Sequence, residues 1–150
     1  MNPSLKSSLL SLAAGLVLTV ASHAADPAAE AGPNKGKLVG QPPDQAEVLI
    51  AADGTLTVTF LDAGKKSVAP GSRTVAVFAQ LESGRQPVEM VARDNAFVSA
   101  APLPKPEGYV LVVQTRASAE AKPANSRLTY AMHTCGGCKL PEYACTCTEH

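Results

Sequence analysis

The side chains best suited to bind a metal ion are concentrated at the C-terminal end of the chain. All four cysteines and two of the three histidines lie within residues 133–150, and the cysteines follow the spacing C-x2-C-x6-C-x-C. Two thiolates separated by two residues can bind one tetrahedral ion, in which neighbouring sulfur atoms lie about 3.7 Å apart. Soft sulfur ligands suit Zn²⁺ or Cu⁺. The pattern predicts a site for one such ion, with candidate ligands Cys135, Cys138, Cys145, Cys147, His133 and His150.

The residues between these cysteines also favour a closed site. Gly136 and Gly137 free the backbone to bend between the first pair, and Pro141 helps the chain to turn back towards the second. Lys139 would offset part of the excess negative charge of four thiolates around Zn²⁺. Each histidine could complete a three-sulfur site or extend it to a second ion, although a single exposed histidine is more often solvated.

Two other interpretations of the cysteines remain open. In an oxidising compartment they could form structural disulfides, paired crosswise because a bond within Cys145-Thr146-Cys147 would close a strained ring. They could also belong to a thiol-exchange enzyme, but such an enzyme needs a helix after the first cysteine. The sequence after Cys138 has no helical pattern and contains Pro141.

No catalytic group is expected outside the tail, and the chain is interpreted as a protein without enzymatic activity. Residues 25–132 contain no histidine or cysteine, which excludes a Ser-His or Cys-His pair within them. The carboxylates of this region are interpreted as solubilising surface charges. They include Glu47, Asp53, Asp62, Glu82, Glu89 and Asp94.

The charge balance excludes two classes of partner. The chain has 13 Lys and Arg residues against 13 Asp and Glu residues, so its net charge is zero. A protein that binds nucleic acid or an anionic membrane surface needs an excess of positive charge. We therefore expect no nucleic-acid partner.

The N-terminal residues predict export. Lys6 is followed by an apolar stretch over residues 7–21 and by small residues at a signal-peptidase site, so residues 1–24 are interpreted as a signal peptide. The mature chain would be a periplasmic or secreted monomer with no stable membrane insertion after cleavage. Residues 25–44, rich in Ala, Pro, Gly and Asn, are expected to be a flexible linker.

Residues 45–132 predict an all-β domain. Short runs rich in β-branched residues alternate with turn residues every eight to fifteen positions, which is typical of a sandwich. We expect an immunoglobulin-like β-sandwich of about seven strands, followed by the Cys/His-rich tail at residues 133–150. The expected strands are 46–50, 55–61, 73–79, 87–93, 96–100, 109–116 and 127–132.

The alternation within these runs predicts which side chains face the core. Leu56, Val58 and Phe60 alternate with threonines and should point inward. Residues 109–113 are apolar on both faces, which is typical of a central strand covered on each side. Helical content should be low.

Two segments resemble a small β-domain of exported proteins and of periplasmic adaptor subunits of heavy-metal efflux systems. They are Gly36-Lys37-Leu38-Val39-Gly40 and the strands at 45–50 and 54–63; the Cys-Gly-Gly-Cys-Lys and Glu-Tyr-Ala-Cys-Thr-Cys segments resemble tails of exported bacterial proteins. The chain departs from that pattern at Asn34-Lys35, where histidine is frequent, so no metal role is transferred to the N-terminal segment. The resemblance implies metal handling and a periplasmic efflux component as a partner. We therefore expect a metal buffer or delivery accessory; the alternative is a disulfide-stapled structural or protein-interaction domain without metal.

Overall fold

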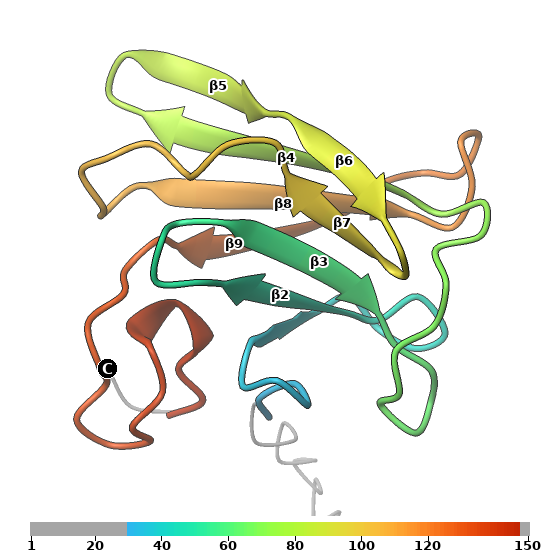
Figure 1. The fold of residues 1–150 in the computed structure, drawn as a ribbon, viewed down its shortest axis with the longest axis horizontal. Coiled ribbons are helices and arrows are strands. Elements are labelled where there is room, and N and C mark those ends of the chain that lie inside the picture. Colours follow the sequence, from blue (N-terminus) through green and yellow to red (C-terminus); the bar gives the residue numbers. More distant parts are fainter. Residues whose placement is uncertain (1–29, 148–150) are drawn as a thin grey trace, which may run out of the picture.

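Two antiparallel β-sheets form the body of the molecule (Figure 1). The computed structural model describes residues 30–147. The five-stranded sheet contains, in spatial order, β1 (Lys37–Val39), β2 (Ala46–Ile50), β3 (Leu56–Phe60), β7 (Ala96–Ser99) and β6 (Met90–Arg93). The four-stranded sheet contains β5 (Gly84–Val88), β4 (Thr74–Leu81), β8 (Val110–Arg116) and β9 (Ala124–Thr129). The two sheets share one hydrophobic core, so the predicted all-β sandwich is confirmed.

The order of the strands is consistent with an immunoglobulin-like sandwich. β2, β3, β7 and β6 occupy the places of strands A, B, E and D, and β4, β8 and β9 those of C, F and G. The sandwich has nine strands rather than about seven. One additional strand arises because the expected run 87–93 divides at Glu89, where the chain passes from one sheet to the other. The other is β1, which pairs with β2.

The core is built by the alternation that the sequence predicts. Leu56, Val58 and Phe60 of β3 are buried, whereas Thr57 and Thr59 are only partly covered. β8 lies between β4 and β9, and Leu111, Val112 and Val113 are all buried, as expected of a central strand. Burial of one such side chain stabilises a fold by about 1.5–3 kcal/mol. The sandwich therefore gives the residues that follow β9 a stable core to pack against.

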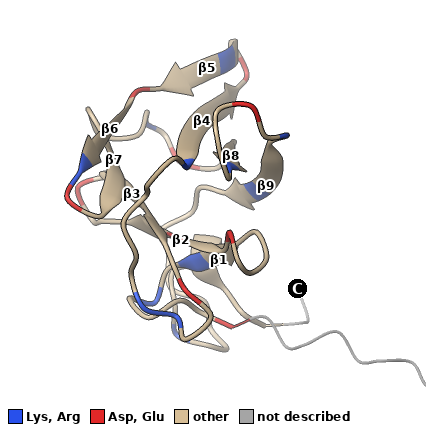
Figure 2. Ribbon diagram, turned by 90° about the vertical axis from the view of Figure 1, so that its right-hand side faces the viewer, with Lys and Arg blue, Asp and Glu red and all other residues tan. Residues whose placement is uncertain are grey.

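Helical structure is almost absent from residues 30–147. Only the 3₁₀ turn η1 (Glu142–Ala144) is found there, and no helix of this part is long and apolar enough to cross a membrane. The predicted signal peptide at 1–24 and the candidate ligand His150 lie outside the described residues. Lysines and arginines are interspersed with acidic residues along loops and strand ends (Figure 2).

The structure differs from the expected linker over β1 and the loop before it. β1 pairs in antiparallel register with β2, and Val39 is buried in the core. This segment carries only the apolar pair Leu38-Val39 among glycines, prolines and polar residues. Its order depends on partners elsewhere in the chain, which local composition does not reveal.

Glu47 of β2 is the main partner of that loop. Its side chain is 1% exposed, so the expectation of a surface charge is wrong. One carboxylate oxygen accepts hydrogen bonds from the backbone N–H groups of Asn34 and Gly36, and the other accepts one from Asn34 Nδ2, each at 2.8 Å. A buried charge is tolerated when it is hydrogen-bonded in this way. The carboxylate therefore fixes the path of the chain into β1.

We expect Glu47→Ala to lower the free energy of unfolding by about 2–4 kcal/mol, because it leaves donors of the loop without an acceptor. Glu47→Gln should cost about 1 kcal/mol, since an amide oxygen can still accept from the two backbone N–H groups. Urea denaturation monitored by circular dichroism measures both values. The exposed Glu82 provides a control, and Glu82→Ala should change stability by less than about 0.5 kcal/mol. Equal effects of Glu47→Ala and Glu82→Ala would contradict the role of the carboxylate.

Candidate metal centre

A short hairpin places the first cysteine pair at its tip. The chain leaves β9 and is met by a returning segment, with hydrogen bonds from Tyr143 N to Ala131 O at 3.0 Å and from Glu142 N to His133 O at 2.9 Å. Cys135 N donates to Leu140 O at 2.8 Å, which closes the ladder. The turn between Cys135 and Leu140 contains Cys138, so the backbone itself brings the first two thiols to one end of the hairpin.

The returning segment is anchored in the core of the sandwich. Tyr143 and Ala144 of η1 are buried within the hydrophobic cluster. The Tyr143 hydroxyl accepts a hydrogen bond from the backbone N–H of Ile50, at the end of β2, over 2.9 Å. The tail is therefore packed as part of the sandwich and does not hang from it, although the sequence places a domain boundary after Met132.

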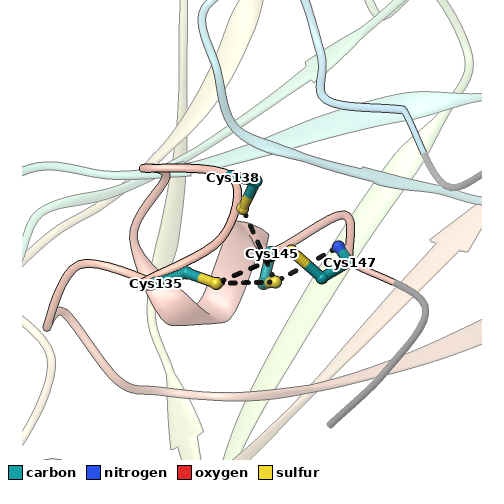
Figure 3. Close-up of side chains that lie close together, drawn as sticks. All are labelled: Cys135, Cys138, Cys145 and Cys147. Atoms are coloured by element: carbon teal, nitrogen blue, oxygen red, sulfur yellow. Dashed lines mark hydrogen bonds between the residues drawn. The ribbon is translucent and has the colours of Figure 1, made fainter.

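The anchored turn brings the second cysteine pair against the first. Figure 3 shows the sulfur atoms of all four cysteines converging, and they lie within 4.8 Å of one another. Sγ of Cys145 is 3.3 Å from Sγ of Cys135 and 3.6 Å from that of Cys138. Sγ of Cys147 is 3.8 Å from that of Cys135. These distances bracket the separation of about 3.7 Å in a tetrahedral four-sulfur site, so the residues fit one ion.

Backbone N–H groups point at the sulfur atoms and favour their negatively charged form. Cys147 N lies 3.3 Å from Sγ of Cys145. Hydrogen bonds from the backbone of Thr146 and Leu140 lower the pKa of the Cys138 thiol to about 6. Burial instead raises the pKa of the Cys145 thiol to about 12. The cluster therefore contains one thiol that ionises readily and one that is held neutral until an opposite charge arrives.

Gly137 leaves the space that Cys147 occupies. A Cβ atom at Gly137 would lie 2.7 Å from Sγ of Cys147, whereas one at Gly136 would meet no atom within 4 Å. Neither glycine has a positive φ; in this turn that conformation falls on Lys139, at 62°. The glycines were expected to provide backbone freedom, but the requirement at Gly137 is steric.

The four sulfur ligands differ in their exposure. Cys135 and Cys145 are 4% and 8% exposed, and we call them the floor pair. Cys138 and Cys147 are only partly buried, and we call them the rim pair. Each pair therefore combines one cysteine of the C-x2-C half of the motif with one of the C-x-C half. One face of the cluster is therefore closed by protein and the other is accessible.

Two lysines lie beside the cluster. Lys37 Nζ, on β1, donates to the carbonyl oxygen of Cys145 over 3.0 Å, and Lys139 Nζ donates to that of Gly136 over 2.6 Å. Lys37 was not singled out in the sequence, since 108 residues separate it from Cys145. The two ammonium groups would partly offset the charge of bound thiolates.

The structure does not bring His133 into the sulfur cluster. Its carbonyl oxygen is part of the hairpin ladder, and its largely exposed ring lies 3.8 Å from a carboxylate oxygen of Glu142. Only the four cysteines group at ligand distance in the described part of the chain.

An open pocket of about 690 Å³ lies elsewhere, between residues 80–83 and 105–110. Lys105 Nζ on its wall is 2.9 Å from Glu107 Oε1 and 3.1 Å from the Tyr130 hydroxyl. The pocket is lined by neither cysteine nor histidine, so it adds no soft ligand to the centre.

We expect Gly137→Ala to weaken Zn²⁺ binding by about tenfold or more, a loss of at least about 1.4 kcal/mol, because the added Cβ displaces the sulfur of Cys147. Gly136→Ala is the matched control and should leave the affinity unchanged. Competition with a chromogenic chelator measures both constants. Equal affinities of the two variants would contradict the steric role of Gly137.

In the reduced, metal-free protein at pH 7, iodoacetamide should modify Cys138 first and Cys145 last. A thiolate reacts and a thiol does not, so the reaction at Cys138 should slow as the pH falls through about 6. Mass spectrometry of peptides from a time course reads the order. Modification of Cys145 before Cys138 would show that the backbone donors do not act as described.

No family model, curated protein or solved structure matches this chain. The resemblance to periplasmic efflux adaptors therefore stays a prediction, and the assignment of function rests on the geometry of the cysteines.

Proposed function

We propose that this chain is an exported metal-binding protein that holds one Zn²⁺ or Cu⁺ ion through Cys135, Cys138, Cys145 and Cys147. It would act as a metal buffer or delivery accessory. The observation that carries the proposal is the convergence of four sulfur atoms within 4.8 Å at the end of an anchored hairpin. The N-terminal sequence supports export, and the resemblance to efflux adaptors supports a periplasmic efflux component as a partner.

The ligand set favours a soft ion. Thiolates bind Zn²⁺ with tetrahedral geometry, and the same sulfurs suit Cu⁺, which needs only two or three of them. Backbone N–H groups directed at Cys138 and Cys145 stabilise charge on sulfur. Lys37 and Lys139 place positive charge close to the ligands. Hard ions such as Mg²⁺ and Ca²⁺ require oxygen ligands, which the cluster lacks.

A second candidate is a structural or interaction domain whose cysteines form two disulfides. The distances of 3.6 Å for Cys138 and Cys145 and 3.8 Å for Cys135 and Cys147 would allow two crosswise bonds. Export would favour oxidation. A separate measurement must therefore distinguish a reduced, metal-bound tail from an oxidised one.

Native mass spectrometry of freshly isolated full-length protein makes this distinction. We expect the mass of one ion per chain, lost on treatment with a strong chelator and regained when Zn²⁺ is added. Cys135→Ser should abolish uptake while the circular dichroism spectrum of the sandwich is retained, because Tyr143 and the core hold the tail.

A different result in the same measurement would contradict metal binding. Metal-free protein that is lighter by the four hydrogens of two disulfides, and that takes up neither Zn²⁺ nor Cu⁺ after reduction, would overturn the proposal. Global unfolding of Cys135→Ser would show instead that the cysteines are needed for the fold.

A further inference from the structure

The rim pair and the floor pair are held by the chain in different ways. Cys135 is fixed by the hydrogen bond from its N–H to Leu140 O and by one from Lys139 N to its carbonyl oxygen. Cys145 donates its N–H to Glu142 O and accepts from Lys37 Nζ. Both floor residues are buried as well. The floor sulfurs are thus fixed by backbone contacts on both sides of the residue.

The rim sulfurs are more exposed than the floor sulfurs. Sγ of Cys147 lies in the space left by Gly137. Cys138 stands at the tip of the hairpin turn, between Gly137 and Lys139. Both side chains are partly exposed, so within residues 30–147 the rim is the side from which a molecule in solution can approach an ion. Of these two ligands, Cys138 is the more firmly held, because its sulfur accepts hydrogen bonds from the backbone of Thr146 and Leu140.

From this asymmetry we infer that the ion is transferred by ligand exchange through the rim, Cys147 first and Cys138 second, to an acceptor that presents at least two thiols. The inference rests on the proposed function and adds to it the class of partner and the direction of approach. The floor pair holds the ion until two thiols of the acceptor have bound it. An acceptor with oxygen ligands alone would compete poorly for a soft ion.

Each exchange step conserves charge and electrons. A thiol of the acceptor loses its proton as its sulfur forms a bond to the ion. The bond between the ion and Cys147 breaks, and the Cys147 thiolate takes up a proton. The second step repeats this at Cys138, and no group is oxidised or reduced. The transfer rate should therefore rise in proportion to the acceptor concentration, because the acceptor enters before the ion leaves.

The test uses full-length protein loaded with one Zn²⁺ and a small dithiol, dithiothreitol, as the acceptor, followed by a zinc-sensitive dye. For the native chain we expect a rate proportional to dithiol concentration. Cys147→Ser should still load one ion but release it about tenfold faster, since one ligand less holds it. Cys145→Ser, the floor variant, should fail to load a full equivalent. Gly136→Ala, in open space beside the cluster, should behave like the native chain.

A second readout does not depend on variants. Brief alkylation of the loaded native protein should mark Cys147 and Cys138 before Cys135 and Cys145. A rate that is independent of dithiol concentration, equal behaviour of the Cys147 and Cys145 variants, or alkylation of the floor pair first would overturn the inference while leaving metal binding intact. Failure of the native chain to load any ion would overturn the proposed function and the inference with it.

Discussion

The hydrogen bond between the Ile50 N–H and the Tyr143 hydroxyl, with the burial of Tyr143 and Ala144 around it, is the interaction on which the cysteine cluster depends. A tail of this length cannot form a core of its own, and ordering it alone would cost conformational entropy with little burial in return. Because η1 packs into the sandwich, that cost is met by the same apolar contacts that stabilise the domain. The anchored backbone then holds the sulfur atoms close together, and a preorganised site binds its ion more tightly.

A second chain of contacts links the cluster to the opposite end of the sequence. The carboxylate of Glu47 orients the loop from Asn34 to Gly36, this loop leads directly into β1, and β1 places Lys37 at the carbonyl oxygen of Cys145. Removal of the carboxylate would therefore disturb both a buried hydrogen-bond group and the position of a charge near the floor pair. The segment that resembles a linker by composition is, in this arrangement, part of the support of the candidate site.

The sequence alone predicts the β-sandwich and the cysteine ligands better than it predicts the contacts that connect the two. Leu56, Val58 and Phe60 follow a period of two and are buried. The four cysteines are also identified by spacing. By contrast, Glu47 occupies a position where a carboxylate is normally exposed, and only the distant donors of Asn34 and Gly36 make its burial possible. The roles of Lys37, Tyr143 and Gly137 are equally non-local, since each depends on an atom that only the tertiary structure brings close.

The arrangement of the sulfurs also bears on the choice between a metal and two disulfides. Two disulfides would pair Cys138 with Cys145, whose sulfurs are 3.6 Å apart, and Cys135 with Cys147, whose sulfurs are 3.8 Å apart. A disulfide would also draw its sulfurs to about 2.0 Å, against a hairpin ladder and an anchored turn that hold both halves in place. A tetrahedral ion requires separations of about 3.7 Å, which are close to those already present, and it satisfies all four sulfurs at once. Binding an ion needs sulfur shifts of only a few tenths of an ångström, which side chains can make. A disulfide needs a larger shift, which the packed hairpin and turn resist, so the geometry favours the ion.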